Sequence, residues 1–202
     1  MQLSLSSNNI DDYLEKTEII NYDAGNVIIT ARKLKDESKT EIELIKNTFE
    51  FVRDKVGHSA DINGVHVTCK ASDVLEYREG ICYAKSHLLA ALLRCNGIPS
   101  GFCYQKLILD DDTAKYLILH GLNAVYIKEL GKWIRLDARG NKPGVEAEFS
   151  LEDEKLAFPI REEFGEVDIP VIFDKPDYNV IQALISYDTV TDMFNNLPRK
   201  LV

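Results

Sequence analysis

Three residues whose side chains cooperate in nucleophilic catalysis stand in order along the chain: Cys82, His120 38 residues later, and Asp137 17 residues after that. A cysteine thiolate can attack the carbonyl carbon of an amide, and a neighbouring imidazole can take up a proton and return it. A carboxylate beside the imidazole fixes its tautomer and stabilises its charged form. These residue types predict a Cys–His–Asp triad that acts on amide bonds through a thioester.

Cys82 follows Gly80-Ile81 and opens the segment from Cys82 to Arg94, whose apolar run Leu88 to Leu93 covers nearly every side of a helix. The unpaired N–H groups and the positive dipole end of that helix favour a thiolate at its first turn. Gly80 would allow close approach by a substrate. The alternative is a cysteine that simply packs, a description that also fits the three remaining cysteines: Cys69, Cys95 and Cys103.

His120 interrupts an apolar strand, and Asp137 ends the next strand. If these strands form a hairpin that turns near Gly131, Asp137 falls near a diagonal neighbour of His120. The alternatives are a structural histidine and an aspartate that only starts a turn. His87 would lie about 140° around the helix from Cys82 and point elsewhere. The other two histidines, which we expect to be solvated or structural unless a loop moves, are His58 and His66.

The elements that position these residues follow from apolar periodicity and turn residues. The pattern predicts a strand over 26–30 and a helix over 41–53 that is capped by Asp36 or Ser38. It also predicts a short helix that begins at Ser72 and ends before Gly80, with three residues turned inward: Val74, Leu75 and Tyr77. After the buried helix it predicts strands over 100–109, 116–127 and 133–137, with a turn at Asp110–Asp112. One buried helix followed by an antiparallel meander indicates an α+β fold.

The chain becomes irregular after about residue 141, where prolines recur, and a final helix is predicted over 180–185. We expect a single domain overall, with a core over 1–150 and a C-terminal extension over 151–202 that packs on it. The extension could cover part of the site and influence specificity, or it could only stabilise the core.

Three ordered motifs resemble those of the transglutaminase-like superfamily. The first is Gly-x-Cys opening a helix that ends in Leu-Arg-x-x-Gly-Ile-Pro, the second is His followed by Asn-x-Val-Tyr, and the third is Gly-x-Trp-x-x-x-Asp. The matching residues are Gly80, Cys82, Leu93, Arg94, Gly97, Ile98, Pro99, His120, Asn123, Val125, Tyr126, Gly131, Trp133 and Asp137. The resemblance covers roughly residues 40 to 140 and implies a papain-like fold with Cys82, His120 and Asp137 as the triad.

The chain departs from the family's pattern beside the triad. Many members carry Trp and Glu where Leu122 and Ala124 stand here, and Pro-Thr where Ala138-Arg139 follows the aspartate. No specificity is carried over from the family, which includes proteases, transamidases and peptide N-glycanases. The residues that we expect to contact substrate are Tyr83, Asn123, Trp133 and Arg139. The main-chain N–H of Cys82 is the expected first oxyanion donor.

We expect a peptidase or amidase, in which water resolves the acyl-enzyme, rather than a cross-linking enzyme, in which an amine does so. The alternative from another class is a catalytically inactive module that binds protein or peptide. A metal site built from His58, His66 and Cys69 has no common ligand spacing. We expect no metal and no cofactor.

Composition narrows the possible partners. The chain carries 24 basic and 33 acidic residues, a formal net charge of −9, and its basic residues are scattered. Nucleic-acid and anionic-membrane binding depend on clustered Lys and Arg, so we expect neither partner. The first residues lack the basic and apolar regions of a signal peptide, and the cysteines need not form disulfides, so a cytoplasmic location is expected. The expected partner is a peptide, protein or small amide substrate.

Overall fold

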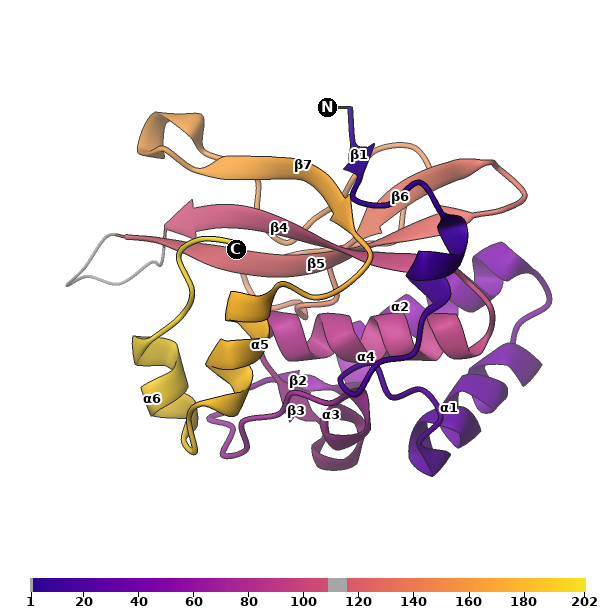
Figure 1. Cartoon of the computed structure of the whole chain (residues 1–202), viewed down its shortest axis with the longest axis horizontal. Coiled ribbons are helices and arrows are strands. Elements are labelled where there is room, and N and C mark those ends of the chain that lie inside the picture. Colours follow the sequence, from indigo (N-terminus) through magenta and orange to yellow (C-terminus); the bar gives the residue numbers. More distant parts are fainter. Residues whose placement is uncertain (1, 109–115) are drawn as a thin grey trace.

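The structure is a computed structural model and describes residues 2–108 and 116–202. Its centre is a five-stranded sheet in the order β1-β7-β4-β5-β6, in which β1 is parallel to β7 and the other neighbours are antiparallel. The helices α1 to α4 gather on one side of this sheet, with α4 lying along it (Figure 1). The strands are β1 Ser4–Leu5, β4 Ser100–Ile108, β5 Leu117–Ile127, β6 Lys132–Leu136 and β7 Val167–Phe173.

The remaining elements of the described residues are six helices, two short 3₁₀ helices and a second, two-stranded parallel sheet. They are η1 Ile10–Leu14, α1 Gly25–Asp36, α2 Glu41–Lys55, β2 Gly57–His58, α3 Ala71–Tyr77, β3 Glu79–Gly80, α4 Cys82–Cys95, η2 Glu162–Phe164, α5 Tyr178–Ile185 and α6 Val190–Asn195. This mixture of helices and an antiparallel sheet confirms the predicted α+β fold. No helix in the described ranges is long and apolar enough to cross a membrane.

The central helix α4 confirms the strongest prediction from the sequence. Every residue from Cys82 to Arg94 is buried, because the helix lies between the sheet and the other helices. Its end is set by Gly97, which has a φ of 75° and donates its N–H to Arg94 O at 2.9 Å. Glycine adopts this left-handed conformation without steric cost. The helix therefore has a fixed length and a fixed first residue, Cys82.

The hairpin of β5 and β6 has the predicted register. Asn123 pairs with Leu136, so Asp137 follows immediately beyond the last ladder pair and lies diagonally from His120. Gly131 makes the turn with a φ of 61°. The predicted turn at Asp110–Asp112 lies outside the described residues.

The predicted strand over 26–30 is wrong, because this segment forms helix α1. Val27, Ala31 and Leu34 are buried and recur every three or four residues, which places them on one face of a helix against the core. Burial of that face overrides the strand preference of the β-branched residues. The predicted cap of α2, Asp36 or Ser38, is also wrong. The cap is Thr40, whose Oγ1 accepts the N–H of Glu43 at 3.1 Å.

Helix α3 begins at Ala71 and ends before Gly80, close to its predicted bounds. Val74 and Leu75 are buried as expected. Tyr77 is not turned inward: it is 48% exposed and stacks on His66 with their ring centroids 4.0 Å apart.

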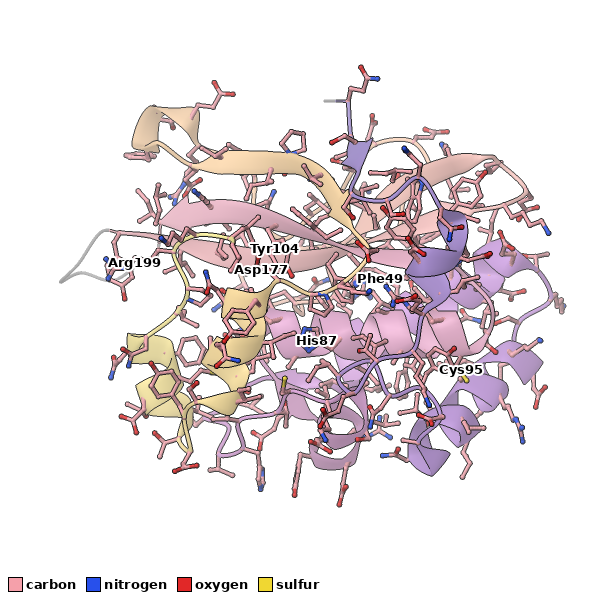
Figure 2. The ribbon with its side chains drawn as sticks, viewed as in Figure 1. Phe49, His87, Cys95, Tyr104, Asp177 and Arg199 are labelled. Atoms are coloured by element: carbon pink, nitrogen blue, oxygen red, sulfur yellow. The ribbon has the colours of Figure 1, made fainter. Side chains whose placement is uncertain are left out.

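The segment after residue 150 takes part in the sheet. Strand β7 lies between β1 and β4, and the sequence pattern missed it and α6. The predicted final helix is present as α5. Its cap, Asp177, donates its main-chain N–H to the hydroxyl of Tyr104 on β4 at 2.9 Å, and Figure 2 shows these two residues together. The last quarter of the chain thus completes the sheet as well as packing on it.

Candidate active site

Cys82 is the first residue of α4 and follows Ile81, whose extended backbone has φ −79° and ψ 175°. The N-cap residue, Ile81, makes no side-chain hydrogen bond to this helix end. The positive end of the helix dipole lies beside the Cys82 sulfur. The expectation that Gly80 allows close approach by a substrate is wrong. A Cβ at Gly80 would lie 3.0 Å from Ala84 Cβ and Thr68 Oγ1, so the glycine serves tight packing beneath the helix.

His120 and Asp137 are joined by a hydrogen bond of 2.8 Å between Nε2 and Oδ2. Asp137 is buried, and its carboxylate also accepts the main-chain N–H groups of Arg139 and Ala157, each at 3.1 Å. Three donors fix the carboxylate in one orientation. The ring of His120 is held in turn, because β5 fixes its backbone and the ring of Phe158 packs edge-on 5.0 Å away.

The electrostatics of these groups favour a charged histidine. Burial alone lowers the pKa of His120, but the charges of Asp137 and Cys82 and the hydrogen bond to Asp137 raise it to about 10. Burial raises the pKa of Asp137, yet the charge of His120 and the three hydrogen bonds hold it below its ordinary value. The structure therefore brings Cys82, His120 and Asp137 together, with His120 between the other two.

A cavity of about 630 Å³ opens beside Cys82 and His120. Its walls are mostly apolar and come from β4, β5, the start of α4, residues 58–60, residues 139–145 and two segments beyond residue 150. Apolar wall residues are Leu107, Ile118, Phe158, Pro159, Phe194 and Leu197. A cavity of this size and polarity suits part of a peptide or a small apolar molecule.

Two of the residues expected to contact substrate line this cavity. Tyr83 is buried in its wall, and its hydroxyl donates to the main-chain oxygen of Leu119. Arg139 also lines the cavity, where its guanidinium binds the carboxylate of Asp61 and lies over the ring of Phe158. Both polar groups are therefore already engaged within the protein.

The other two lie elsewhere, which corrects the expectation that they contact substrate. Asn123 is fully buried, and its Nδ2 donates to Ser86 O at 3.1 Å and Gly101 O at 3.2 Å. It joins α4 to the sheet. Trp133 packs between Tyr13, 4.9 Å away, and Tyr126, 5.5 Å away. Both motif residues therefore pack the interior of the fold and do not line the cavity.

The four histidines have four different environments. His87, midway along α4 in Figure 2, shares a hydrogen bond of 2.9 Å between Nδ1 and Cys69 O, away from Cys82 as helical geometry predicted. His66 is half exposed and bonded to Glu79. His58, expected in a solvated loop, is buried and lines the cavity with Cys82. It stands in a short polar segment without periodicity, so the sequence carried no signal for it.

His58, His66 and Cys69 do not converge on a metal site. Within residues 2–108 and 116–202, no cluster of three or more His, Cys, Asp and Glu side chains is arranged to hold a metal ion. Burial raises the pKa of Cys69 to about 12, so its thiol stays protonated at neutral pH.

Comparison with solved structures finds proteins of similar fold. One is the solved structure of a protein from Cytophaga hutchinsonii, provisionally assigned as a cysteine protease, with 20% sequence identity and a TM-score of 0.52. The match covers 66% of this chain and 43% of that protein's chain. Another is the periplasmic domain of TgpA from Pseudomonas aeruginosa, bound to ethylmercury, with 17% sequence identity and a TM-score of 0.46. The match covers 62% of this chain and 46% of that domain's chain. The chain thus spans less than half the length of these structures.

No curated protein matches the sequence. The family description that does match is the transglutaminase-like superfamily, over residues 29–138, which is more than half of the chain and includes Cys82, His120 and Asp137. The chain therefore belongs to the transglutaminase-like superfamily.

Proposed function

We propose that this protein is a cysteine acyl-transfer enzyme that cleaves amide bonds through a thioester on Cys82. The observation that carries the proposal is the position of His120, which hydrogen-bonds to Asp137 at 2.8 Å and lines one cavity with Cys82, where the charges of the two side chains act on each other. A histidine placed between a carboxylate and a thiol in this way can pass a proton between the sulfur and a substrate while the carboxylate stabilises its charge.

The reaction follows from this arrangement. The Cys82 thiolate attacks the amide carbon, a C–S bond forms, and the carbonyl electrons move onto oxygen. The main-chain N–H of Cys82, at the unpaired end of α4, donates to that oxygen. As the C–N bond breaks, His120 gives its proton to the departing amine. His120 then takes a proton from water, whose oxygen attacks the thioester and releases a carboxylic acid and the Cys82 thiolate.

We propose water as the acyl acceptor, which makes the enzyme a peptidase or amidase. An amine acceptor would use the same thioester and give cross-linking instead. The apolar walls of the cavity favour an apolar acyl group beside Cys82. The proposed substrate is thus a peptide, protein or small amide with an apolar residue at the scissile bond.

The first test is the reactivity of Cys82 towards iodoacetamide at neutral pH, mapped by mass spectrometry in wild type and His120→Ala. Cys69 and Cys103 serve as internal comparators, since burial raises the pKa of each to about 12. We expect selective labelling of Cys82 that slows strongly in His120→Ala. If Cys82 labels no faster than a small-molecule thiol such as glutathione and the variant behaves like wild type, the enzyme proposal fails and a binding module becomes the better interpretation.

A further inference from the structure

The backbone of His58 runs directly beside the segment that leads into Cys82. Strand β2 pairs in parallel with β3, and His58 lies opposite Gly80, two residues before the cysteine. The main-chain N–H of Ser59 donates to Gly80 O at 3.2 Å and fixes this pairing. His58 and the N-terminus of α4 are therefore held on the same side of the cavity.

The buried imidazole of His58 has an unpaired nitrogen. Its side chain is about nine-tenths buried in the wall that it shares with Cys82 and His120, and its Nδ1 atom has no hydrogen-bond partner among the described residues. The nearest carboxylate, Asp61, has Oδ2 4.0 Å from His58 Nδ1, which is too far for a hydrogen bond. Asp61 binds Arg139 and Lys142 instead. Buried polar groups nearly always have partners, so an unpaired nitrogen in a ring that lines a cavity indicates a ligand.

His58 is also the uncharged histidine of the cavity. Burial lowers its pKa, and the positive charges of Arg139, Lys85 and His120 lower it further against the opposing charge of Asp61, to about 3. A neutral imidazole carries one N–H donor and one acceptor nitrogen. His120 in the same cavity is positively charged at neutral pH. The two histidines are therefore suited to different roles, His120 to proton transfer and His58 to hydrogen bonding as a neutral ring.

We propose that His58 is a second oxyanion donor, whose ring N–H binds the substrate carbonyl oxygen together with the main-chain N–H of Cys82. This assignment rests on the proposed acyl transfer. As the Cys82 sulfur bonds to the carbonyl carbon, negative charge gathers on the oxygen, and the two donors stabilise it without giving up a proton. His58 keeps its proton throughout, while His120 performs the proton transfers. Two other polar side chains of the cavity wall are engaged within the protein: Tyr83 with Leu119 O, and Arg139 with Asp61.

Two reactions at the same sulfur separate this role from a structural one. Acylation by p-nitrophenyl acetate passes through a tetrahedral oxyanion, whereas alkylation by iodoacetamide displaces iodide without forming one. The variants are His58→Phe, which keeps a ring but no donor, and His58→Gln, which keeps an N–H donor. His66→Phe is the matched control, because His66 is half exposed and outside the cavity. Both rates are measured on the full chain, by nitrophenolate release and by intact mass.

We expect His58→Phe to lower the acylation rate of Cys82 by about 10²- to 10³-fold, as for loss of one oxyanion donor, with the alkylation rate unchanged. His58→Gln should recover part of the loss, and His66→Phe should match wild type in both reactions. An equal loss in both reactions, or no loss of acylation, would overturn the role of His58 alone. Wild-type Cys82 that is inert to both reagents would overturn the proposed function, and this assignment with it.

Discussion

Asp137 holds His120 through a 2.8 Å hydrogen bond, and the Oδ2 atom that accepts it also accepts the main-chain N–H of Ala157. Ala157 lies beyond the matched family region, which ends at residue 138. The orientation of the carboxylate therefore depends partly on a segment that the family core does not include. The same segment supplies Phe158, which packs on the ring of His120.

The first prediction concerns this carboxylate. Asp137→Asn keeps the size of the side chain but removes the charge that stabilises a protonated His120. We expect acylation of Cys82 by p-nitrophenyl acetate to fall by about 10³- to 10⁴-fold, the range typical of losing the acid of a triad. Stopped-flow nitrophenolate release measures the rate, and far-ultraviolet circular dichroism checks the fold. Full activity in a folded variant would remove Asp137 from the mechanism.

The second prediction concerns pH. The pKa of His120 is raised to about 10, so the histidine stays positively charged beside Cys82 through the neutral range. In an NMR titration, the carbon-bound ring protons of His120 should therefore keep the chemical shift of a charged imidazole between about pH 6 and pH 8, where an ordinary histidine with a pKa of ~6.5 loses its charge. In Asp137→Asn the histidine loses its anionic partner, and its pKa should fall. A wild-type His120 that loses its charge between pH 6 and pH 8 would contradict the raised pKa.

The third prediction concerns Lys85, which is fully buried on α4 and donates to Val56 O at 2.5 Å and Arg53 O at 3.2 Å. Burial, and then the charge of Arg139, lowers its pKa from 10.5 to about 7. Between these values the unfolded chain binds a proton that the folded chain does not. The free energy of unfolding must therefore rise with pH across this window.

Lys85→Met removes this titration and leaves the other groups in place. The stability of wild type relative to the variant should increase from pH 7 towards pH 10, by up to about 1.4 kcal/mol per unit. Urea unfolding with reductant at several pH values measures the difference. If the free energies of unfolding of wild type and variant differ by the same amount at every pH, the variant has only lost hydrogen bonds. Lys85 would then have an ordinary pKa in the folded protein.

The fourth prediction concerns the apolar cavity. The p-nitrophenyl ester of hexanoate should acylate Cys82 faster than that of acetate, because the longer chain buries more apolar surface, worth about 0.8 kcal/mol per CH₂ at most. Leu197→Ala should reduce this preference, since Leu197 lines the cavity. Leu201→Ala, in the same tail but outside the cavity wall, should leave it intact. Equal rates for both esters would contradict an apolar acyl site.

The sequence alone determined the elements whose patterns are strong and local. Leu88 to Leu93 make a helix buried on all sides, Gly97 ends it, and Gly131 turns the β5–β6 hairpin. The spacing of Cys82, His120 and Asp137 then follows from a helix start and two paired strands. These features are set by apolar period and turn geometry, which neighbours in the chain largely decide.

Only the tertiary structure decided the rest. Residues 26–30 read as a strand, but burial of Val27 and Ala31 against the core makes them a helix, because packing outweighs local propensity. The place of β7 between β1 and β4 depends on pairing across most of the chain. His58 reached the cavity for the same reason: its pairing with Gly80 joins residues far apart in sequence, and no local pattern encodes such a contact.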